Sequence, residues 1–214
     1  MKTQFFLLRH GECEGGNILR GRVDVPLSMN GWQQMHTAVL KLPNVPDVVV
    51  SSPLRRCAEF AHQLQLKIGV DVHINDGLQE MDFGDWDGQT FNDLYAKAES
   101  ALERYWQNPW SETPPNGESM LMFEHRIDRV WRQLSHDFMG KAVLVVAHGG
   151  VIRHIMSRVL GVKRCAGIYS QLALGYGAMV NVEVYTHCDE KHDVNAHQTE
   201  GVQFYSRLHW PILG

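Results

Sequence analysis

Two histidine–glycine pairs, each placed directly after an apolar run, are the residues of this chain whose types and spacing could do chemistry. His10–Gly11 follows the run at residues 5–8 and Arg9, and His148–Gly149 follows the run at residues 143–147. Short runs that are apolar throughout are typical of buried parallel strands. Because such strands end at one edge of an open α/β sheet, we expect the two imidazoles to lie face to face. A cationic pocket that holds a nucleophilic histidine suits phosphoryl transfer.

A third apolar run, at residues 47–50, leads into a pair of arginines. Ser51–Ser52 and Pro53 follow it, which predicts a helix with a serine cap and with proline in its first turn. Arg55 and Arg56 would then lie in that turn, where free backbone N–H groups and arginine side chains attract anions. In isolation such a pair is typical of a solvated surface. Its expected place beside the two histidines favours an anion site.

An acidic loop at residues 78–88 supplies candidates for a proton donor. It contains Glu80, Asp82, Asp85 and Asp87, with glycine at both turns. A departing alkoxide needs a proton, which a carboxylic acid held near the phosphate can supply. The spacing does not distinguish among the four carboxyl groups, and acidic residues in loops are ordinarily solvated.

Six motifs follow one another between residue 3 and about residue 160. They are Leu8–Glu12, Gly21–Ser28, Ser51–Arg56, Leu78–Gly88, Pro115–Ser119 and Val146–Gly150. In type and order they resemble the histidine phosphatase superfamily, in the branch that contains cofactor-independent phosphatases and cofactor-dependent phosphoglycerate mutases. Six ordered motifs make this resemblance specific.

The resemblance implies His10 as the nucleophile, Glu80 as the proton donor, and Arg9, Arg56 and His148 as the phosphate pocket. Neutral His10 would attack phosphorus in line while Glu80 protonates the departing oxygen, and water would then hydrolyse the phosphohistidine. The second histidine serves best when it is charged, which its reference pKa of about 6.5 allows.

The family register also bears on neighbouring positions. It selects Arg56 over Arg55, because the family arginine is the sixth residue of the Ser-Ser motif. Asn17 matches a family asparagine near the phosphate, although one extra residue at Gly15–Gly16 separates it from His10. The further substrate-binding positions that we expect are Gly11, Asn17 and Gly149.

Composition agrees with one α/β domain over residues 1–214. The expected architecture is a three-layer sandwich, with a mainly parallel central sheet, helices on both faces, and a helical insertion at about residues 85–117 over the active site. A net charge of −4 argues against nucleic-acid binding. We expect a cytoplasmic protein, because the sequence has no membrane-length apolar stretch, no room for a signal peptide and no Cys-x-x-Cys spacing. We expect that the protein uses no metal and no cofactor and that its partner is a small-molecule phosphate ester. A homodimer is possible on the sequence alone.

Periodicity and capping residues predict five helices and a late hairpin. The helices are expected at residues 27–42, capped near Ser28, and at 53–67, 90–107, 118–138 and 149–160. Alternation at residues 179–185 and 202–208 predicts the hairpin. Its connector, residues 187–197, is rich in metal-type ligands, but their spacing fits no zinc pattern, so we expect a solvated loop.

The motifs leave several substrates open. The best match is to phosphatases of α-ribazole 5′-phosphate, which act in cobalamin synthesis, and it rests on chain length, the motif at residues 83–87 and an aromatic insertion. In the insertion Tyr95, Tyr105, Trp106 and Trp110 could stack on an aromatic leaving group, or equally pack as core. The alternatives are a broad-specificity phosphatase, a fructose-2,6-bisphosphatase-like sugar phosphatase, a phosphoglycerate mutase and a non-catalytic phospho-ligand binding protein.

Overall fold

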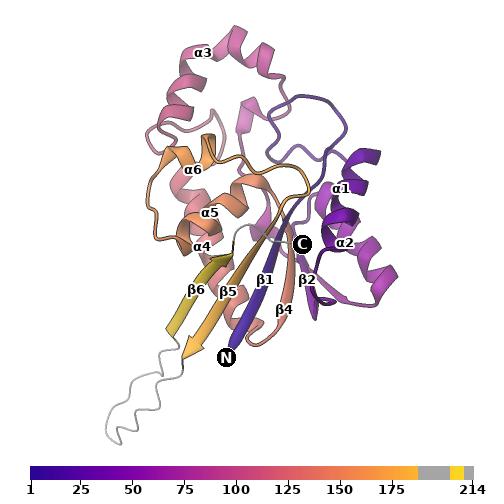
Figure 1. Ribbon diagram of the computed structural model, residues 1–214. Helices are drawn as coiled ribbons and strands as arrows, with labels where there is room; N and C mark the ends of the chain where they lie inside the picture. The colour runs from indigo at the N-terminus through magenta and orange to yellow at the C-terminus, as the bar shows by residue number, and fades with distance from the viewer. Residues whose placement is uncertain (188–202, 210–214) are drawn as a thin grey trace, which may run out of the picture.

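A six-stranded sheet runs through the computed structural model, which describes residues 1–187 and 203–209 (Figure 1). Its strands are β1 (Lys2–Arg9), β2 (Val48–Ser51), β3 (Asp71–Ile74), β4 (Ala142–Ala147), β5 (Met179–His187) and β6 (Gln203–His209). The order is β3-β2-β4-β1-β5-β6, in which β1 to β4 are parallel and β5 and β6 antiparallel to their neighbours. Because β4 lies between β1 and β2, the carboxyl ends of these three strands meet at one edge.

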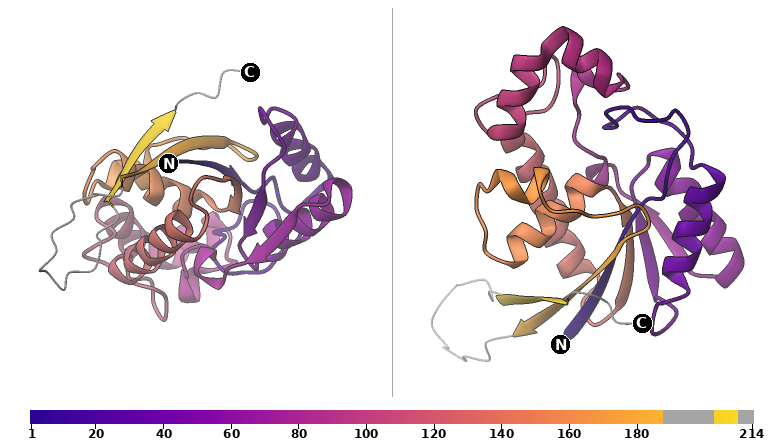
Figure 2. Two further views of the ribbon diagram at one scale, coloured as in Figure 1. Left: turned by 90° about the horizontal axis from the view of Figure 1, so that it is seen from below. Right: turned by 45° about the horizontal axis from the view of Figure 1, so that its top comes forward.

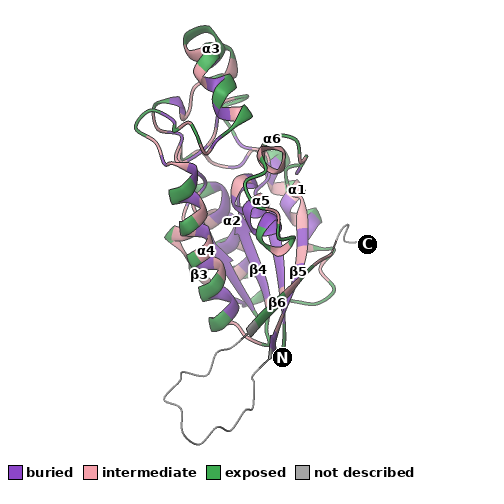
Figure 3. Cartoon of the chain, turned by 90° about the vertical axis from the view of Figure 1, so that its left-hand side faces the viewer, coloured by how far each residue is buried: buried purple, intermediate pink, exposed green. Residues whose placement is uncertain are grey.

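Helices cover both faces of this sheet (Figures 1 and 2). They are α1 (Met29–Val39) and α2 (Arg55–Ile68) on one face, and α4 (Met120–Asp137) and α5 (Gly149–Val159) on the other. Successive strand residues point to opposite faces, so Phe5 joins the core under α4 and α5, whereas Phe6 joins the core under α1 and α2. Figure 3 shows the central strands as buried and the outer side of α4 as exposed. The predicted three-layer α/β fold is confirmed.

Three helices begin at a residue whose hydroxyl accepts a backbone N–H, namely Ser28 for α1, Thr90 for α3 (Phe91–Gln107) and Ser119 for α4. These starts agree with the predicted helices. The start of α2 was predicted wrongly, because this helix begins at Arg55 without a side-chain cap and Pro53 stands in the bend before it. The arginine pair nonetheless occupies the first turn.

The insertion between β3 and β4 rises beyond the carboxyl edge of the sheet (Figures 1 and 2). Its main element, α3, bends at Ala98, where the backbone is non-helical. Trp86 and Trp106 both pack edge to face against Tyr105, with ring centroids 5.7 and 5.1 Å away. Because Tyr105 is buried in this cluster, the aromatic residues of the insertion serve partly as core.

Two short elements were not predicted, and their sequence pattern explains why. β3 has only four residues, in which the alternation of Val72 and Ile74 with polar residues is too short for a clear strand signal, and α6 (Ala166–Ser170) has five residues and none that is buried. The late hairpin is confirmed, since β5 and β6 pair with Asn181 opposite His209. The connector predicted as a solvated loop lies outside the described residues, apart from the end of β5. Across the described part of the chain, no helix combines the length and the apolar character needed to cross a membrane.

Candidate active site

His10 and His148 lie side by side at the carboxyl edge of the sheet. They directly follow β1 and β4, in which Arg9 stands opposite Ala147. The two ring centroids are 5.2 Å apart and the ring planes are inclined by 60°, so the imidazoles meet edge to face. Both side chains are buried. The two apolar runs therefore bring the histidines together as expected, but not with their ring faces parallel.

Hydrogen bonding gives His10 a defined tautomer. Its Nδ1 lies 2.8 Å from the carbonyl oxygen of Gly11, and because a carbonyl oxygen only accepts, Nδ1 carries the hydrogen. Burial, followed by nearby guanidinium charges, lowers the pKa of His10 well below its usual value near 6.5; the arginines are Arg56, Arg9 and Arg20. The imidazole is therefore neutral at neutral pH, with an unprotonated Nε2.

His148 has other partners. Nε of Arg56 donates to Nδ1 of His148 over 3.3 Å, and Nε2 of His148 lies 2.7 Å from Oγ of Ser52. Burial and then the Arg56 charge lower the pKa of His148 well below 6.5. The free protein thus holds this histidine neutral, whereas the mechanism expected from the sequence uses it charged. A bound phosphate dianion would favour the proton again.

Arg56 is the buried member of the arginine pair that opens α2. It donates to the carbonyl oxygens of Val23 at 2.8 Å and Gly21 at 2.5 Å, in addition to the second histidine. Arg55 is exposed and pairs with Glu59 one turn later, at 2.7 Å. The arginine at the histidines is therefore the one that the family register selects.

Arg9 lies under a tyrosine ring. Its guanidinium carbon is 4.4 Å from the ring centroid of Tyr176, and its Nη1 donates to the carbonyl oxygen of Leu174. Within the described part of the chain its buried Nε has no hydrogen-bond partner. Burial also lowers the pKa of Arg9. Because a buried donor without an acceptor is costly, this side chain is suited to an anionic ligand.

Among the four acidic residues of the loop at residues 78–88, Glu80 is the one that bonds to the segment directly after His148. Its Oε2 accepts from the backbone N–H of Gly150 at 2.9 Å, and its Oε1 from that of Met81 at 3.0 Å. A Cβ at position 150 would lie 2.5 Å from Oε1, so glycine there makes room for the carboxyl group. Glu80 is buried and fixed beside the first turn of α5.

The other three acidic residues of that loop hold protein segments together. Asp87 accepts the backbone N–H groups of residues 21–23, and Asp82 pairs with Arg22 at 3.3 Å. Asp85 accepts from the side-chain amide of Asn116. These contacts distinguish the four carboxyl groups, which the spacing alone did not.

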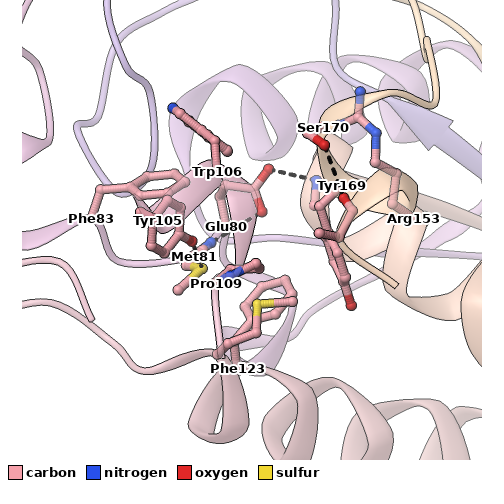
Figure 4. A pocket seen from close by; sticks show the side chains of 13 residues that line it. Glu80, Met81, Phe83, Tyr105, Trp106, Pro109, Phe123, Arg153, Tyr169 and Ser170 are labelled. Carbon is pink, nitrogen blue, oxygen red and sulfur yellow. Dashed lines mark hydrogen bonds between the residues drawn. The ribbon is translucent and has the colours of Figure 1, made fainter. Parts of the chain in front are cut away.

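An aromatic pocket of about 550 Å³, its open mouth included, adjoins Glu80 (Figure 4). Tyr105 and Trp106 lie on one side, and Tyr169 and Arg153 on the other. Glu80 and Arg153 are its two charged lining residues, and most of the other lining residues are apolar or aromatic. The pocket fits a mainly apolar group attached to a phosphate.

Two residues of the site, Tyr176 and Arg153, were not predicted from the sequence, and the role of Asn17 stays a prediction. Asn17 is exposed and makes no side-chain hydrogen bond to the described residues. Tyr176 contacts both Arg9 and His10, but it comes from a loop with no local signal. Arg153 follows Gly149 by four residues, one helical turn, so helical spacing would have placed it on the same face.

Two buried thiols lie against the two histidines. Sγ of Cys13 is 3.5 Å from Nδ1 of His10, and Sγ of Cys57 is 3.8 Å from Nε2 of His148. Burial raises the pKa of both thiols, which keeps them protonated and poorly reactive. We therefore assign both thiols a role in packing against the histidine rings, and not a role in chemistry.

A mainly parallel sheet with two histidines at its carboxyl edge, and with arginines beside them, defines an α/β protein of the histidine phosphatase type. The chain belongs to the histidine phosphatase superfamily (branch 1), whose family model matches residues 5–196. The family predicted from the six motifs is confirmed.

Similar proteins include enzymes that are named for different substrates. A bifunctional protein of Mycobacterium tuberculosis is 33% identical over 187 residues, 86% of this chain and 50% of that protein. This chain thus spans about half the length of the first curated relatives it matches. Adenosylcobalamin/alpha-ribazole phosphatase of Escherichia coli (strain K12) is 31% identical over 164 residues, 74% of this chain and 79% of the relative. The structure of mycobacterial glucosyl-3-phosphoglycerate phosphatase has a TM-score of 0.77 at 25% identity, covering 97% of each chain.

Proposed function

We propose that this protein hydrolyses phosphate monoesters through a phosphohistidine on His10. Nε2 attacks phosphorus in line, so a P–N bond forms as the P–O bond to the alcohol breaks. Water then cleaves the P–N bond, which releases inorganic phosphate and free His10. The observation that carries this proposal is the neutral His10 with its hydrogen on Nδ1, which leaves Nε2 unprotonated.

Arg9, Arg56 and His148 hold the phosphoryl group in this proposal. The two guanidinium groups meet the charge that spreads over the phosphoryl oxygens, and the unpartnered Nε of Arg9 supplies one donor. Further contacts with the phosphoryl group remain predictions from the family register. They involve Gly11 and Asn17 in the loop after β1, and Gly149 in the first turn of α5.

Glu80 donates the proton to the departing alcohol. It is buried, it lines the aromatic pocket, and the three neighbouring acidic residues have other partners. The leaving group would occupy the pocket, with its oxygen toward Glu80.

The insertion at about residues 85–117 then acts as a cap on one catalytic domain over residues 1–214, a domain we place in the cytoplasm. Light scattering would distinguish a monomer from a homodimer.

The nucleophile is tested by rapid quenching with radiolabelled p-nitrophenyl phosphate. We expect an acid-labile, base-stable label in the wild type, and no label and no turnover in His10→Ala. His62→Ala, which removes an exposed histidine of α2, is the matched control and should label normally. Turnover by His10→Ala at the wild-type rate would refute the mechanism.

The proton donor is tested by the acidity of the leaving group. Glu80→Gln should lower the hydrolysis of alkyl phosphates by about 10²-fold or more, because an alkoxide departs poorly without a proton. Hydrolysis of p-nitrophenyl phosphate should fall much less, since nitrophenolate departs unaided. Asp82→Asn serves as the control. If Asp82→Asn shows this dependence and Glu80→Gln does not, Asp82 is the donor.

For the substrate we propose α-ribazole 5′-phosphate, whose benzimidazole suits an aromatic pocket. A second candidate, glucosyl 3-phosphoglycerate, is favoured by Arg153, which could pair with a carboxylate in the same pocket. The specificity constant kcat/KM for the two substrates distinguishes them. Similar values for both and for unrelated phosphate esters would instead indicate a broad-specificity phosphatase.

A further inference from the structure

Two partly buried hydrogen bonds connect α4 through α5 to the wall of the aromatic pocket. Oδ1 of Asp128 lies 2.8 Å from Nε2 of His154, and Nδ1 of His154 lies 2.8 Å from the hydroxyl of Tyr169. His154 is 2% exposed, and the ring of Phe123 packs edge-on against it at 6.1 Å. Tyr169 lines the pocket, whereas His154 and Asp128 lie behind that wall.

The direction of the hydrogen bond between His154 and Asp128 follows from its acceptor. The Asp128 carboxylate accepts from Nε2 of His154 and also from Nε of Arg158 at 3.0 Å. Nδ1 of His154 and the hydroxyl of Tyr169 share the second hydrogen bond. Burial raises the pKa of Tyr169, so this hydroxyl stays protonated as a donor. The hydroxyl of Tyr169 is therefore held by His154 at the back of the pocket wall.

Tyr169 needs such an anchor because its own helix is weak. α6 has five residues, no side-chain cap and no buried residue, and so short a helix has little stability of its own. On its other side the Tyr169 ring meets Trp110 edge to face, with centroids 5.9 Å apart. The ring thus stands where α5, α6 and the segment after α3 meet, across the pocket from Tyr105 (Figure 4).

We propose that Tyr169 is a specificity-determining residue that selects planar, apolar leaving groups, and that Asp128 and His154 are positioning residues that act through it. The ring offers an aromatic wall on which a planar group packs, and the hydrogen-bonded chain keeps the wall in place. A small alkyl group gains nothing from this wall. The inference rests on the phosphatase function proposed above.

The test compares two substrates whose leaving groups are both primary alkoxides, 2-naphthylmethyl phosphate and ethyl phosphate. The measured quantity is the ratio of their kcat/KM values, naphthylmethyl over ethyl. Any loss of folded enzyme cancels in this ratio, so a purely structural role would not change it. Tyr169→Ala should lower the ratio about tenfold, mainly through a higher KM for the naphthylmethyl ester, and leave ethyl phosphate within about twofold.

Variants of the three hydrogen-bonded residues separate the effect of the Tyr169 ring from the effect of the two residues that hold it in place. Tyr169→Phe keeps the ring without the hydroxyl, and His154→Gln and Asp128→Asn alter the support. Each should lower the ratio about threefold, because the ring stays but is less well fixed. Adding His154→Gln to Tyr169→Ala should produce no further decrease, since the histidine acts only through the tyrosine.

Tyr95 of α3 provides the matched controls, because it is exposed and does not line the pocket, contrary to the stacking or core role expected from the sequence. Tyr95→Ala and Tyr95→Phe should leave the ratio unchanged. An unchanged ratio in Tyr169→Ala, with both esters hydrolysed, would overturn this inference and leave the proposed function standing. A further decrease on adding His154→Gln to Tyr169→Ala would overturn the positioning role. If the wild type hydrolyses neither ester nor p-nitrophenyl phosphate, the proposed function fails first.

Discussion

At the scale of single residues, the two site histidines are neutral because burial and neighbouring arginines disfavour a second positive charge. The pKa values of His10 and His148 lie well below 6.5 in the folded protein, whereas in the unfolded chain both groups take up protons near 6.5. Below this pH the unfolded state therefore binds more protons, so the free energy of unfolding falls as the pH falls.

We predict that the free energy of unfolding decreases from about pH 6.5 toward pH 5 by up to about 1.4 kcal/mol per pH unit for each histidine. Urea unfolding at several pH values measures it, and most carboxyl groups titrate below this window. His10→Asn and His148→Asn should each reduce the slope, whereas His62→Asn should not. An unchanged slope in both site variants would show that these histidines are not the cause.

A second prediction at this scale separates the paired arginines. Arg56 uses three N–H donors on Val23, Gly21 and the second histidine, a geometry that the single ammonium of lysine cannot reproduce. Arg56→Lys should therefore lower kcat/KM for p-nitrophenyl phosphate by about 10²-fold, on the scale of losing one positioned transition-state donor. Arg55→Lys, at the exposed neighbour, should stay within about twofold. Comparable losses in both variants would contradict the assignment.

At the scale of elements, the loop after β1 and the first turn of α1 meet backbone to backbone. A Cβ on Gly11 would lie 2.1 Å from the carbonyl oxygen of Gly31, and one on Gly31 would lie 2.0 Å from that of Glu12. This close approach requires the glycine next to His10, a position that we also expect to bind substrate. The contact holds the nucleophile loop on α1.

We predict that Gly31→Ala lowers both the melting temperature and kcat/KM. In an unconstrained helix this change would stabilise by about 1 kcal/mol, so a loss would show that overlap with Glu12 outweighs helix propensity. Gly175→Ala is the control, because a Cβ there meets no atom within 4 Å. A higher melting temperature for Gly31→Ala, measured by circular dichroism, would contradict the close contact.

At the scale of the whole molecule, a chain with a net charge of −4 gathers positive charge at one edge of its sheet. Arg9 and Arg56 lie there beside the histidines, and Arg153 lines the adjoining pocket. These side chains can neutralise a phosphate without a metal ion. We predict that activity survives excess EDTA. Loss on chelation with recovery by one divalent metal would contradict this and direct attention to the connector at residues 187–197.

The sequence by itself determined the features that depend on local pattern. Apolar runs predicted the strands before His10 and His148, hydroxyl residues such as Ser28 predicted helix starts, and motif register selected Arg56 over Arg55. These signals are readable because a strand, a cap or a motif is encoded by residues that are adjacent in the chain. Short elements such as β3 and α6 have too few residues for a clear pattern, and the start of α2 was misplaced because a serine before proline suggests a cap.

Only the tertiary structure decided the chemistry of the site. The neutral state of His10 depends on burial and on Arg56, which comes from a distant segment. The distinction between Glu80 and Asp87 depends on which backbone each carboxyl group meets. Tyr169 is held at the pocket wall by hydrogen bonds that involve His154 and Asp128, which lie on other helices. Charge state, hydrogen bonding and pocket shape arise from contacts between remote parts of the chain, which no local spacing encodes.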